Sequence, residues 1–323
     1  MDIDELDEYC MRVFGRSPDA IERPGGKSRK TAVIVLDNQK LVVSRRASPS
    51  RAALEAEVLR RLENTGHVPK LIRVDGAWLI QQHVSGKRLT VPLSDPASSG
   101  YDLLSAAVIS LCALQAAATG CGLSKVAPDI GVRDGWLDEL ISLPQRVAEL
   151  QKLNAPVLDT EAVKAAIAIR TPSFIKWDAR PGNALVRADG SLCWFDWEHC
   201  GNRSAIDDMV WLLADEWSPE APSIEALAID SIAKRFSLGF GEVAEAFHTM
   251  AVFHSMVRIS LVLHHRKNGP WWDHQACLEH DRVGVTQFHL NRLIGRAIRW
   301  SDEAAHLNSI KPLLLELHGK IMK

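Results

Sequence analysis

The feature that most constrains the fold of this chain is the stretch 174–198, which reads FIKWDARPGNALVRADGSLCWFDWE. The short apolar run over 184–186 has the length and composition of a buried strand. The residues ADGS that follow supply a turn, because glycine tolerates a positive φ and aspartate hydrogen-bonds its own turn. The chain then returns as a partner strand. The stretch therefore predicts a loop and a β-hairpin, with Asn183 where the hairpin begins and Asp196 where it ends.

Three polar side chains in this stretch have the spacing with which kinases hold Mg²⁺, ATP and a substrate hydroxyl. Asp178 and Asn183 lie in the loop with four residues between them, and Asp196 ends the second predicted strand. Magnesium prefers oxygen ligands and keeps several waters, so an amide oxygen, a carboxylate and the phosphates of ATP suffice. Asp178 can then face an acceptor hydroxyl. The alternative is an ordinary hairpin with solvated carboxylates, because this spacing alone occurs by chance in many proteins.

The motif DARPGNALV, followed by WFDWE, resembles the aminoglycoside phosphotransferase and choline kinase superfamily, whose members are relatives of the protein kinases. The corresponding loop of that superfamily usually reads HGDxxxxN. The resemblance is closest over residues 173–216 and extends over 25–89. It implies a phosphotransferase that uses ATP and Mg²⁺ as cofactors and a small-molecule acceptor as its partner.

The resemblance also implies roles for individual residues, carried over by position. Asp178 corresponds to the catalytic aspartate. Asn183 and Asp196 correspond to the metal ligands, and Glu198 corresponds to an accessory acidic residue beside the metal. Asp208 corresponds to a structural aspartate that steadies the loop.

The loop departs from the superfamily pattern at the first residue of HGD, which is usually a histidine. Lys176 stands where the histidine is usual, and Trp177 follows it. A lysine only donates hydrogen bonds, so it cannot reproduce every bond of a histidine, and we expect it to pair with a carboxylate in the loop. Arg180 stands two residues after Asp178, where its guanidinium can serve the transferring phosphate. A merely loop-bracing arginine is an equally good interpretation.

A glycine pair precedes two predicted strands near the N-terminus. The run PGGKSR contains Gly25, Gly26 and Ser28. Strand-like segments follow over 31–36 and 41–45. Backbone N–H groups of a glycine turn can approach phosphates closely, and the resemblance implies a phosphate-covering loop here. Without the downstream motif, a plain loop is an equally good interpretation.

The second of these strands should carry the cation that grips the phosphates of the nucleotide. The run offers Ser44, Arg45 and Arg46, and strand alternation lets only one of the two arginines face the cleft. We expect Arg45 to do so; a solvated arginine pair at a strand end is the alternative. In the helix that follows, the pattern EAxxLxxL resembles the superfamily helix whose glutamate pairs with this cation. We assign that role to Glu55, with Glu57 as its competitor.

The connection between the two expected lobes follows a second strand pair. Strands predicted over 70–74 and 78–82 lead into the run QQHV. In a kinase of this kind, the backbone of Gln82 and His83 would meet the edge of the adenine. Residues 90–100 are rich in proline, serine and aspartate and indicate a flexible connection.

Composition excludes several classes of partner. The chain has 323 residues, 46% of them hydrophobic, which is ample for two lobes, and its net charge of −2 argues against a nucleic-acid surface or an anionic membrane. Six cysteines without CxxC spacing predict free thiols in a reducing, cytoplasmic compartment. The acidic start MDIDE predicts no signal peptide, and no apolar run approaches the roughly 20 residues of a membrane span.

The C-terminal part reads as helices that contain many aromatic side chains. Apolar periodicity predicts helices over 101–118, 136–153, 160–169, 224–236 and 243–265. The histidines of this part lack ligand spacing such as HExxH, which favours ordinary buried or exposed histidines over a metal site. Five tryptophans are expected mainly in the core, with a cationic acceptor pocket as the alternative use of their rings: Trp211, Trp217, Trp271, Trp272 and Trp300.

These observations predict an α+β, two-lobed, protein-kinase-like fold. Residues 1–88 form a nucleotide-binding lobe with a small antiparallel sheet, and residues 89–323 form a large, mainly helical lobe that carries the catalytic hairpin and the acceptor site. The expected activity is Mg·ATP-dependent phosphorylation of a small-molecule hydroxyl. A non-catalytic nucleotide-binding protein of the same fold is the alternative, and a helical adaptor is a third. The acceptor and the oligomeric state stay open.

Overall fold

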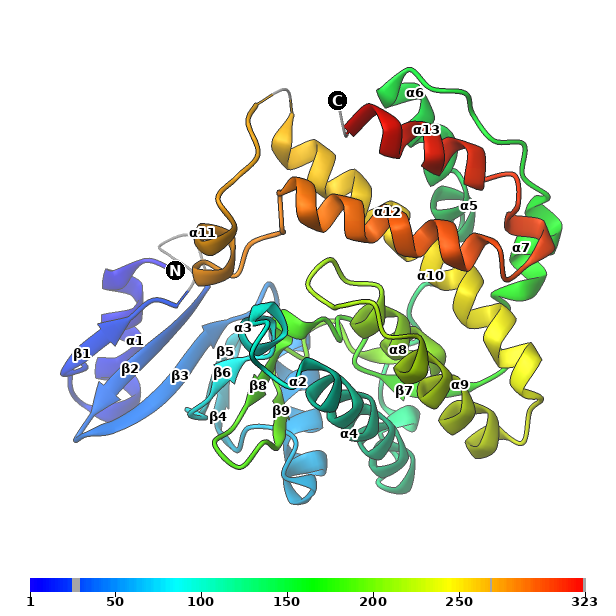
Figure 1. Ribbon diagram of the computed structural model, residues 1–323. Helices are drawn as coiled ribbons and strands as arrows, with labels where there is room; N and C mark the ends of the chain where they lie inside the picture. The colour runs from blue at the N-terminus through cyan, green and yellow to red at the C-terminus, as the bar shows by residue number, and fades with distance from the viewer. Residues whose placement is uncertain (25–29, 268, 322–323) are drawn as a thin grey trace.

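A five-stranded antiparallel sheet forms the N-terminal part of the molecule, drawn in blue and cyan in Figure 1, in the strand order β1-β2-β3-β5-β4. The structure is a computed structural model that describes residues 1–24, 30–267 and 269–321. The strands are β1 (Ala20–Glu22), β2 (Thr31–Leu36), β3 (Gln39–Arg45), β4 (Leu71–Asp75) and β5 (Trp78–Gln82). The predicted hairpins are thus confirmed, with β2 paired to β3 and β4 paired to β5.

Helix α1 (Ile3–Phe14) packs on this sheet. Its apolar stripe buries Leu6, Tyr9 and Cys10, and the ring of Tyr9 stacks on Trp78 of β5 at 4.2 Å. The helix is capped at both ends, because Asp2 accepts from the backbone N–H of Asp4 and a left-handed Gly15 follows the last turn. This contact gives the small sheet a hydrophobic core of its own.

Helix α2 (Pro49–Leu62) joins the sheet to the rest of the molecule. Ser48 caps it by accepting from the backbone N–H of Arg51, as a serine before a proline predicts. Its apolar residues Val58, Leu59 and Leu62 belong to the main core, which continues into the helical part. The helix therefore fixes the position of the sheet relative to the helical part.

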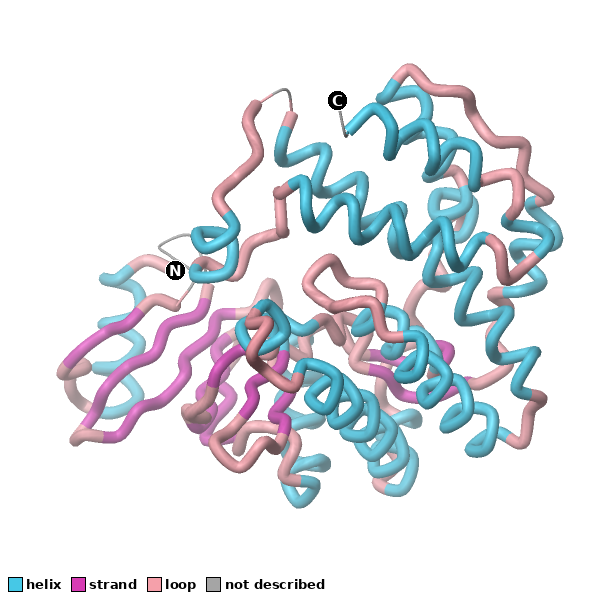
Figure 2. The backbone as a smooth tube through the Cα atoms, in the orientation of Figure 1, coloured by secondary structure: helices cyan, strands magenta, loops and turns pink. Residues whose placement is uncertain are grey.

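Beyond β5 the chain is mainly helical, as Figures 1 and 2 show. Its helices are α3 (Thr90–Ser94), α4 (Gly100–Gly120), α5 (Trp136–Ile141), α6 (Leu143–Gln151), α7 (Thr160–Ala166), α8 (Ile206–Leu213), α9 (Pro222–Phe236), α10 (Phe240–Arg266), α11 (His274–Glu279), α12 (Gln287–Ser301) and α13 (Lys311–Ile321). The helix predicted over 136–153 is divided in two because Pro144, which lacks a backbone N–H, stands in the first turn of α6. This arrangement confirms the two-lobed α+β fold.

Two small sheets lie within the helical part. One has the order β6-β8-β9 and contains the predicted hairpin; the other pairs β7 with β10. These strands are β6 (Lys87–Arg88), β7 (Pro172–Ile175), β8 (Ala184–Val186), β9 (Leu192–Trp194) and β10 (Gly201–Ser204). In the hairpin turn Gly190 has φ +81°, as the ADGS run predicts. Strand β9 ends two residues before Asp196, which lies just beyond it.

Among the helices of the described residues, α4 and α10 are long and apolar enough to cross a membrane by length and composition alone. The sequence expectation that no apolar run approaches this length was therefore too strict. In α10, 67% of the most apolar window is buried inside the protein, and in α4 44% is buried. Helices at the core of globular proteins have this same character, so the finding gives little support for a membrane span.

Candidate active site

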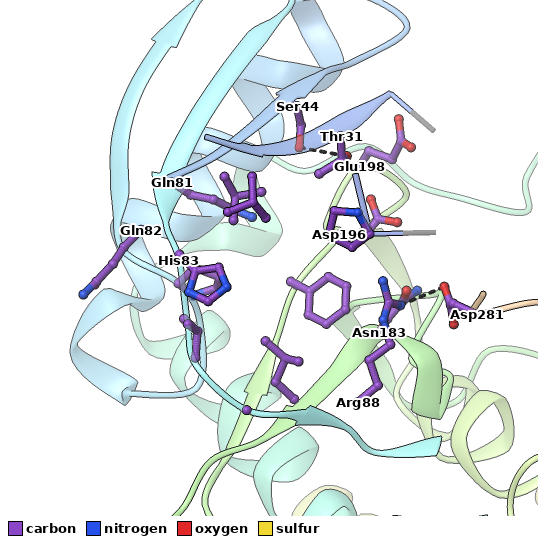
Figure 3. Close-up of a pocket in the computed structure, with 18 of the residues that line it drawn as sticks. Thr31, Ser44, Gln81, Gln82, His83, Arg88, Asn183, Asp196, Glu198 and Asp281 are labelled. Carbon is purple, nitrogen blue, oxygen red and sulfur yellow. Dashed lines mark hydrogen bonds and ion pairs between the residues drawn. The ribbon is translucent and has the colours of Figure 1, made fainter. Parts of the chain in front are cut away.

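A cavity of about 540 Å³ lies between the five-stranded sheet and the β8–β9 hairpin (Figure 3). Thr31, Ser44 and Gln81 line it from the sheet, and Asn183 and Asp196 line it from the hairpin. The hydroxyls of Thr31 and Ser44 hydrogen-bond each other at 3.0 Å across neighbouring strands. The structure thus brings together segments that are more than 100 residues apart in the chain.

The loop before the hairpin fixes Asn183 against Asp178. The amide nitrogen of Asn183 donates to Oδ2 of Asp178 at 2.8 Å and to its backbone carbonyl at 3.0 Å. These two bonds orient the amide, so its oxygen is turned away from Asp178. Nε of Arg180 lies 3.4 Å from Oδ1 of Asp178, which places a guanidinium beside the carboxylate.

Asp196 follows the hairpin in a left-handed backbone conformation, with φ +62°. Non-glycine residues in this region are uncommon and cluster at functional sites, although aspartate tolerates it better than most. Its Oδ1 lies 2.9 Å from a guanidinium nitrogen of Arg46. Burial opposes the ionisation of Asp196, but the cations around it, first Arg46 and then Lys176, lower its pKa below the usual value. The side chain is therefore a carboxylate at neutral pH.

Lys176 bridges the two acidic positions through their backbones. Its ammonium donates to the carbonyl of Asp178 at 3.1 Å and to that of Asp196 at 2.7 Å, and it lies 5.3 Å from the ring centre of Trp197. Burial lowers the pKa of Lys176, although the neighbouring carboxylates oppose this effect. The expectation that it pairs with a loop carboxylate is thus corrected: its hydrogen bonds go to main-chain carbonyls.

Asp208, at the start of α8, fixes the loop through hydrogen bonds to its backbone. Its carboxylate accepts from the backbone N–H groups of Lys176 at 3.0 Å and Trp177 at 2.8 Å, and from the amide of Gln115 at 3.0 Å. Burial raises the pKa of Asp208 to about 6. The geometry is that of a structural aspartate whose hydrogen bonds fix the residues before Asp178.

Of the two adjacent arginines, it is Arg46 that faces the cavity, and the assignment of Arg45 was wrong. Val42, Ser44 and Arg46 face the cavity, whereas Arg45 points to the other side, where it lies over the ring of Trp78 and pairs with Glu5 of α1 at 3.1 Å. The reason is strand alternation: the apolar Val43 of β3 faces the core under α1, so Arg45 must share that face.

Arg46 makes a bidentate ion pair with Glu55 of α2. The helix motif predicted that this glutamate pairs with the cation of the strand. Nε lies 2.6 Å from Oε2, and Nη2 donates to Oε1 at 2.7 Å. The side chain of Glu55 is fully buried and that of Arg46 is 8% exposed. Burial raises the pKa of Glu55, and the guanidinium counteracts this effect. Glu198 lies 3.5 Å from the same guanidinium, at the edge of the cavity.

Gln82 and His83, in the predicted connection between the lobes, also line the cavity, but their side chains point in different directions. Figure 3 shows the ring of His83 directed into the cavity and the side chain of Gln82 directed away from it. The backbone N–H of Gln82 is engaged, because it donates to the carbonyl of Lys70 at 2.9 Å. His83, which follows the last residue of β5, is thus better placed than Gln82 to contact a molecule in the cavity. The remaining nucleotide-loop positions Gly25, Gly26 and Ser28 lie outside the described residues.

Arg88 and Asp281 are among the residues that line the cavity and were not found from the sequence. Arg88 of β6 forms an ion pair with Asp281 at 2.7 Å and donates to the carbonyl of Gly182 at 2.6 Å. Asp281 follows α11 in a left-handed conformation, with φ +48°. No local motif marks either residue, because the pairing joins segments almost 200 residues apart. Within the described ranges, no three His, Cys, Asp or Glu side chains are arranged to hold a metal ion by themselves.

Comparison with known proteins supports the assignment of the fold. The structure resembles aminoglycoside 2′-phosphotransferase-IIIa in its GDP complex, with TM-score 0.57 and 15% identity over 93% of this chain and 99% of that one. It also resembles choline kinase LicA from Streptococcus pneumoniae, with TM-score 0.52 and 11% identity over 92% and 97% of the two chains. Macrolide 2′-phosphotransferase MphH from Brachybacterium faecium gives TM-score 0.50 and 15% identity over 88% and 97%.

Sequence comparison identifies the family directly. No curated protein sequence matches the chain. The model of the phosphotransferase enzyme family, however, matches residues 19–245, which contain the sheet, the hairpin and α8. The matched segment covers more than half of the 323 residues and every position of the cavity except Asp281. The chain therefore belongs to the phosphotransferase enzyme family.

Proposed function

We propose that this protein transfers the γ-phosphoryl group of ATP to a hydroxyl group of a small molecule. The observation that supports this most directly is the set of three side chains at the loop and hairpin, with Asn183 tied to Asp178 and Asp196 lining the same cavity as Asn183. In the reaction the hydroxyl oxygen forms a bond to the γ-phosphorus and the bond to ADP breaks. The hydroxyl proton leaves to Asp178, so the products are a phosphate monoester, ADP and a proton.

The donor set fits Mg²⁺. An amide oxygen from Asn183 and a carboxylate from Asp196 are hard oxygen ligands of the kind magnesium uses, and the phosphates and water supply the rest. Glu198 stands at the rim of the cavity as a further acidic group. When bound, the metal would neutralise charge on the phosphates. The protein's own contribution is to hold these oxygens in place through the Asn183–Asp178 hydrogen bond and the backbone bonds of Lys176.

The other residues of the cavity have roles in binding and orientation. Arg46, fixed by Glu55, offers a guanidinium to the phosphates, and His83 borders the place of the base. Arg180, beside Asp178, offers a second guanidinium to the transferring group. Gly25, Gly26 and Ser28 would cover the phosphates. Catalysis of this kind consists of positioning and charge neutralisation. The GDP complex of the aminoglycoside 2′-phosphotransferase supports a nucleotide here, so GTP is tested beside ATP.

The test compares Asp196→Asn with Asp189→Asn. Asp189 lies in the exposed turn of the same hairpin, where it hydrogen-bonds only Ser191 in the described structure. We expect the wild type and Asp189→Asn to be stabilised by Mg·ATP in a thermal-shift assay and to consume ATP with an acceptor from a panel of amines, sugars and antibiotics. Asp196→Asn should stay folded and lose turnover. Full turnover in Asp196→Asn would refute the proposal.

A non-catalytic nucleotide-binding protein is the second candidate. The observation in its favour is the ion pair between Arg46 and Asp196, which places a guanidinium on the carboxylate that the metal requires. Nucleotide binding that is independent of Mg²⁺, without turnover for any acceptor of the panel, would favour this candidate. Binding that requires Mg²⁺ and is lost in Asp196→Asn would favour the phosphotransferase.

A further inference from the structure

Arg88 lines the cavity of about 540 Å³ from β6, the strand that pairs with β8 of the hairpin. Its side chain is 27% exposed, so part of it is open to the cavity that it lines. Figure 3 shows this side chain directed toward the side of the cavity where Asn183 and Asp196 lie, away from His83. The guanidinium therefore lies at the proposed metal end of the cavity, whereas His83 borders the proposed place of the base.

Contacts from three directions hold this guanidinium in place. Nη1 of Arg88 donates to the carbonyl of Gly182 at 2.6 Å and lies 2.7 Å from Oδ2 of Asp281. The guanidinium carbon lies 5.3 Å from the ring centre of Phe195. Because Gly182 and Phe195 directly precede the two proposed metal ligands in the chain, the guanidinium is held close to both of them.

Asp281, the acidic partner of Arg88, fits closely against the loop before the hairpin. It lies after α11, outside residues 19–245, which match the family model, so the group that orients Arg88 is not part of the family pattern. A Cβ added at Gly182 would lie 2.6 Å from Oδ1 of Asp281, closer than real Cβ atoms come, so the loop requires glycine here. The side chain of Asp281 is only 9% exposed. This close fit fixes the carboxylate and, through it, the guanidinium of Arg88.

Each arginine of the described lining is paired with a carboxylate, and the three pairs are Arg46–Glu55, Arg180–Asp178 and Arg88–Asp281. Arg46 also lies 2.9 Å from Asp196 and 3.5 Å from Glu198, so several carboxylates share its charge. The phosphates of ATP carry more negative charge than this one guanidinium and a metal ion offset. A second guanidinium can contribute, because its several N–H donors let it hold a carboxylate through one nitrogen and a phosphate oxygen through another.

We propose that Arg88 binds a phosphate group of the nucleotide, with its guanidinium held in the binding orientation by Asp281 and the carbonyl of Gly182. This inference rests on the proposed function, because the ligand is the nucleotide of that reaction. Arg46 contacts the phosphates from the five-stranded sheet, and Arg88 contacts them from the side of the hairpin. The alternative role of Arg88 is to neutralise Asp281 without any contact to the nucleotide.

The first test measures the affinity of the wild type and of Arg88→Met for adenosine, AMP, ADP and ATP with Mg²⁺ present, by calorimetry. The guanine series takes their place if the wild type prefers GTP. We expect both proteins to bind adenosine equally and Arg88→Met to bind ATP about ten- to hundredfold more weakly, the value of a hydrogen bond to a charged group. The smallest member of the series that shows this loss identifies the phosphate that Arg88 contacts. An equal loss for adenosine and ATP would indicate a structural role alone and would overturn the proposal.

A double variant separates contact from neutralisation, because in Arg88→Met the carboxylate of Asp281 repels phosphates by itself. Arg88→Met/Asp281→Asn removes both charges and leaves the net charge of the protein unchanged. We expect it to bind ATP about tenfold more weakly than the wild type, since the phosphate contact is still lost. Wild-type affinity in the double variant would show that Arg88 only neutralises Asp281, and the proposal would fall.

Lys87→Met is the matched control. Lys87 adjoins Arg88 in β6, but it is exposed and lies outside the described lining of the cavity. Solvent and salt screen its charge, so the affinity of Lys87→Met for ATP should stay within about twofold of the wild type. A loss in Lys87→Met as large as that in Arg88→Met would mean that any positive charge on β6 has this effect, which contradicts a direct contact. Circular-dichroism melts verify that each variant is folded.

Failure of this inference can be distinguished from failure of the proposed function. If the wild type binds Mg·ATP and phosphorylates an acceptor while the double variant binds ATP as the wild type does, the inference falls and the function stands. If ATP binds with the expected variant pattern but no acceptor is phosphorylated, the phosphotransferase proposal falls and the phosphate contact of Arg88 stands. If the wild type binds neither ATP nor GTP, both fall.

Discussion

Replacing Arg46 by methionine should destabilise the protein severely, whereas the same change at the neighbouring Arg45 should have almost no effect. The two arginines are adjacent in the sequence and identical in chemistry, so they form a matched pair. Arg46 is 8% exposed and is bound through two atoms to the fully buried Glu55. Arg45 is 49% exposed and pairs with Glu5, which is 36% exposed.

The expected magnitudes follow from burial. Removing one partner of a buried ion pair leaves an uncompensated charge and costs about 3–5 kcal/mol of unfolding free energy. An exposed pair contributes about 0–1 kcal/mol, so Arg45→Met should change stability by no more than that. For a chain of this size about 2 °C of melting temperature corresponds to 1 kcal/mol, so Arg46→Met should melt roughly 6–10 °C lower.

The cost of Arg46→Met should also depend on pH. Burial already raises the pKa of Glu55, and loss of the guanidinium raises it further. A carboxyl group whose pKa is higher in the folded state than in the unfolded state stabilises the folded protein at pH values below its unfolded pKa, about 4.3. This contribution to the free energy of unfolding is lost as the pH rises. The free energy of unfolding of Arg46→Met should therefore be closest to that of the wild type near pH 5, and the difference should grow progressively toward pH 8.

Urea unfolding followed by circular dichroism measures these effects at pH 5 and pH 8. The double variant Arg46→Met/Glu55→Leu removes the orphaned carboxylate and should recover most of the stability lost in Arg46→Met at pH 8. The reasoning would be refuted if Arg45→Met and Arg46→Met had equal effects. It would also be refuted if the double variant were less stable than Arg46→Met.

Three further outcomes follow from the described structure. Trp177→Gly should be about 1 kcal/mol more stable than Trp177→Ala in urea unfolding, because both lose the indole and only alanine is strained at φ +70°. Gly86→Ala should cost about 1–3 kcal/mol, since its Cβ would lie 2.6 Å from the carbonyl oxygen of Val186, whereas the open helix position Gly241→Ala should gain about 0.5–1 kcal/mol. Burial, and then the neighbouring carboxylate of Glu216, raise the pKa of Asp215, so the stability that this group contributes is lost as the pH rises above its unfolded value of about 4; the stability of Asp215→Asn relative to the wild type should therefore increase as the pH rises, in melts at successive pH values.

Local sequence patterns were sufficient to predict the hairpin and the residues tied to it. The ADGS turn, the short apolar strands and the spacing of Asp178, Asn183 and Asp196 are all short-range features, and the structure retains them. Glu55 was also found, because the pattern EAxxLxxL of its helix resembles the superfamily helix whose glutamate pairs with the strand cation, and that pattern is local. Features of this kind depend on residues close in the chain, so one sequence contains the information.

The features that were missed depend on contacts between distant segments. In the run LVVSR of β3 both faces are largely apolar, so periodicity alone does not say whether Ser44 or Arg45 faces the cavity. That choice is made by α1, whose Glu5 and Tyr9 cover the other face of the sheet. The pairing of Arg88 with Asp281 also depends on distant segments. It requires the segment after α11 to lie beside β6, which contains Arg88.

Lys176 shows how a departure from a family pattern can keep the geometry that the pattern provides. As a lysine it lacks an acceptor, so it cannot reproduce every hydrogen bond of the usual histidine. Its ammonium nevertheless donates to the backbone carbonyls of both Asp178 and Asp196, so one side chain fixes the two acidic residues relative to each other. Its charge also contributes to lowering the pKa of Asp196, second only to Arg46 among the neighbouring cations. Because Lys176 uses donors to hold main-chain oxygens, the carboxylates of both aspartates stay available for other partners, and the substitution by itself is no argument against catalysis.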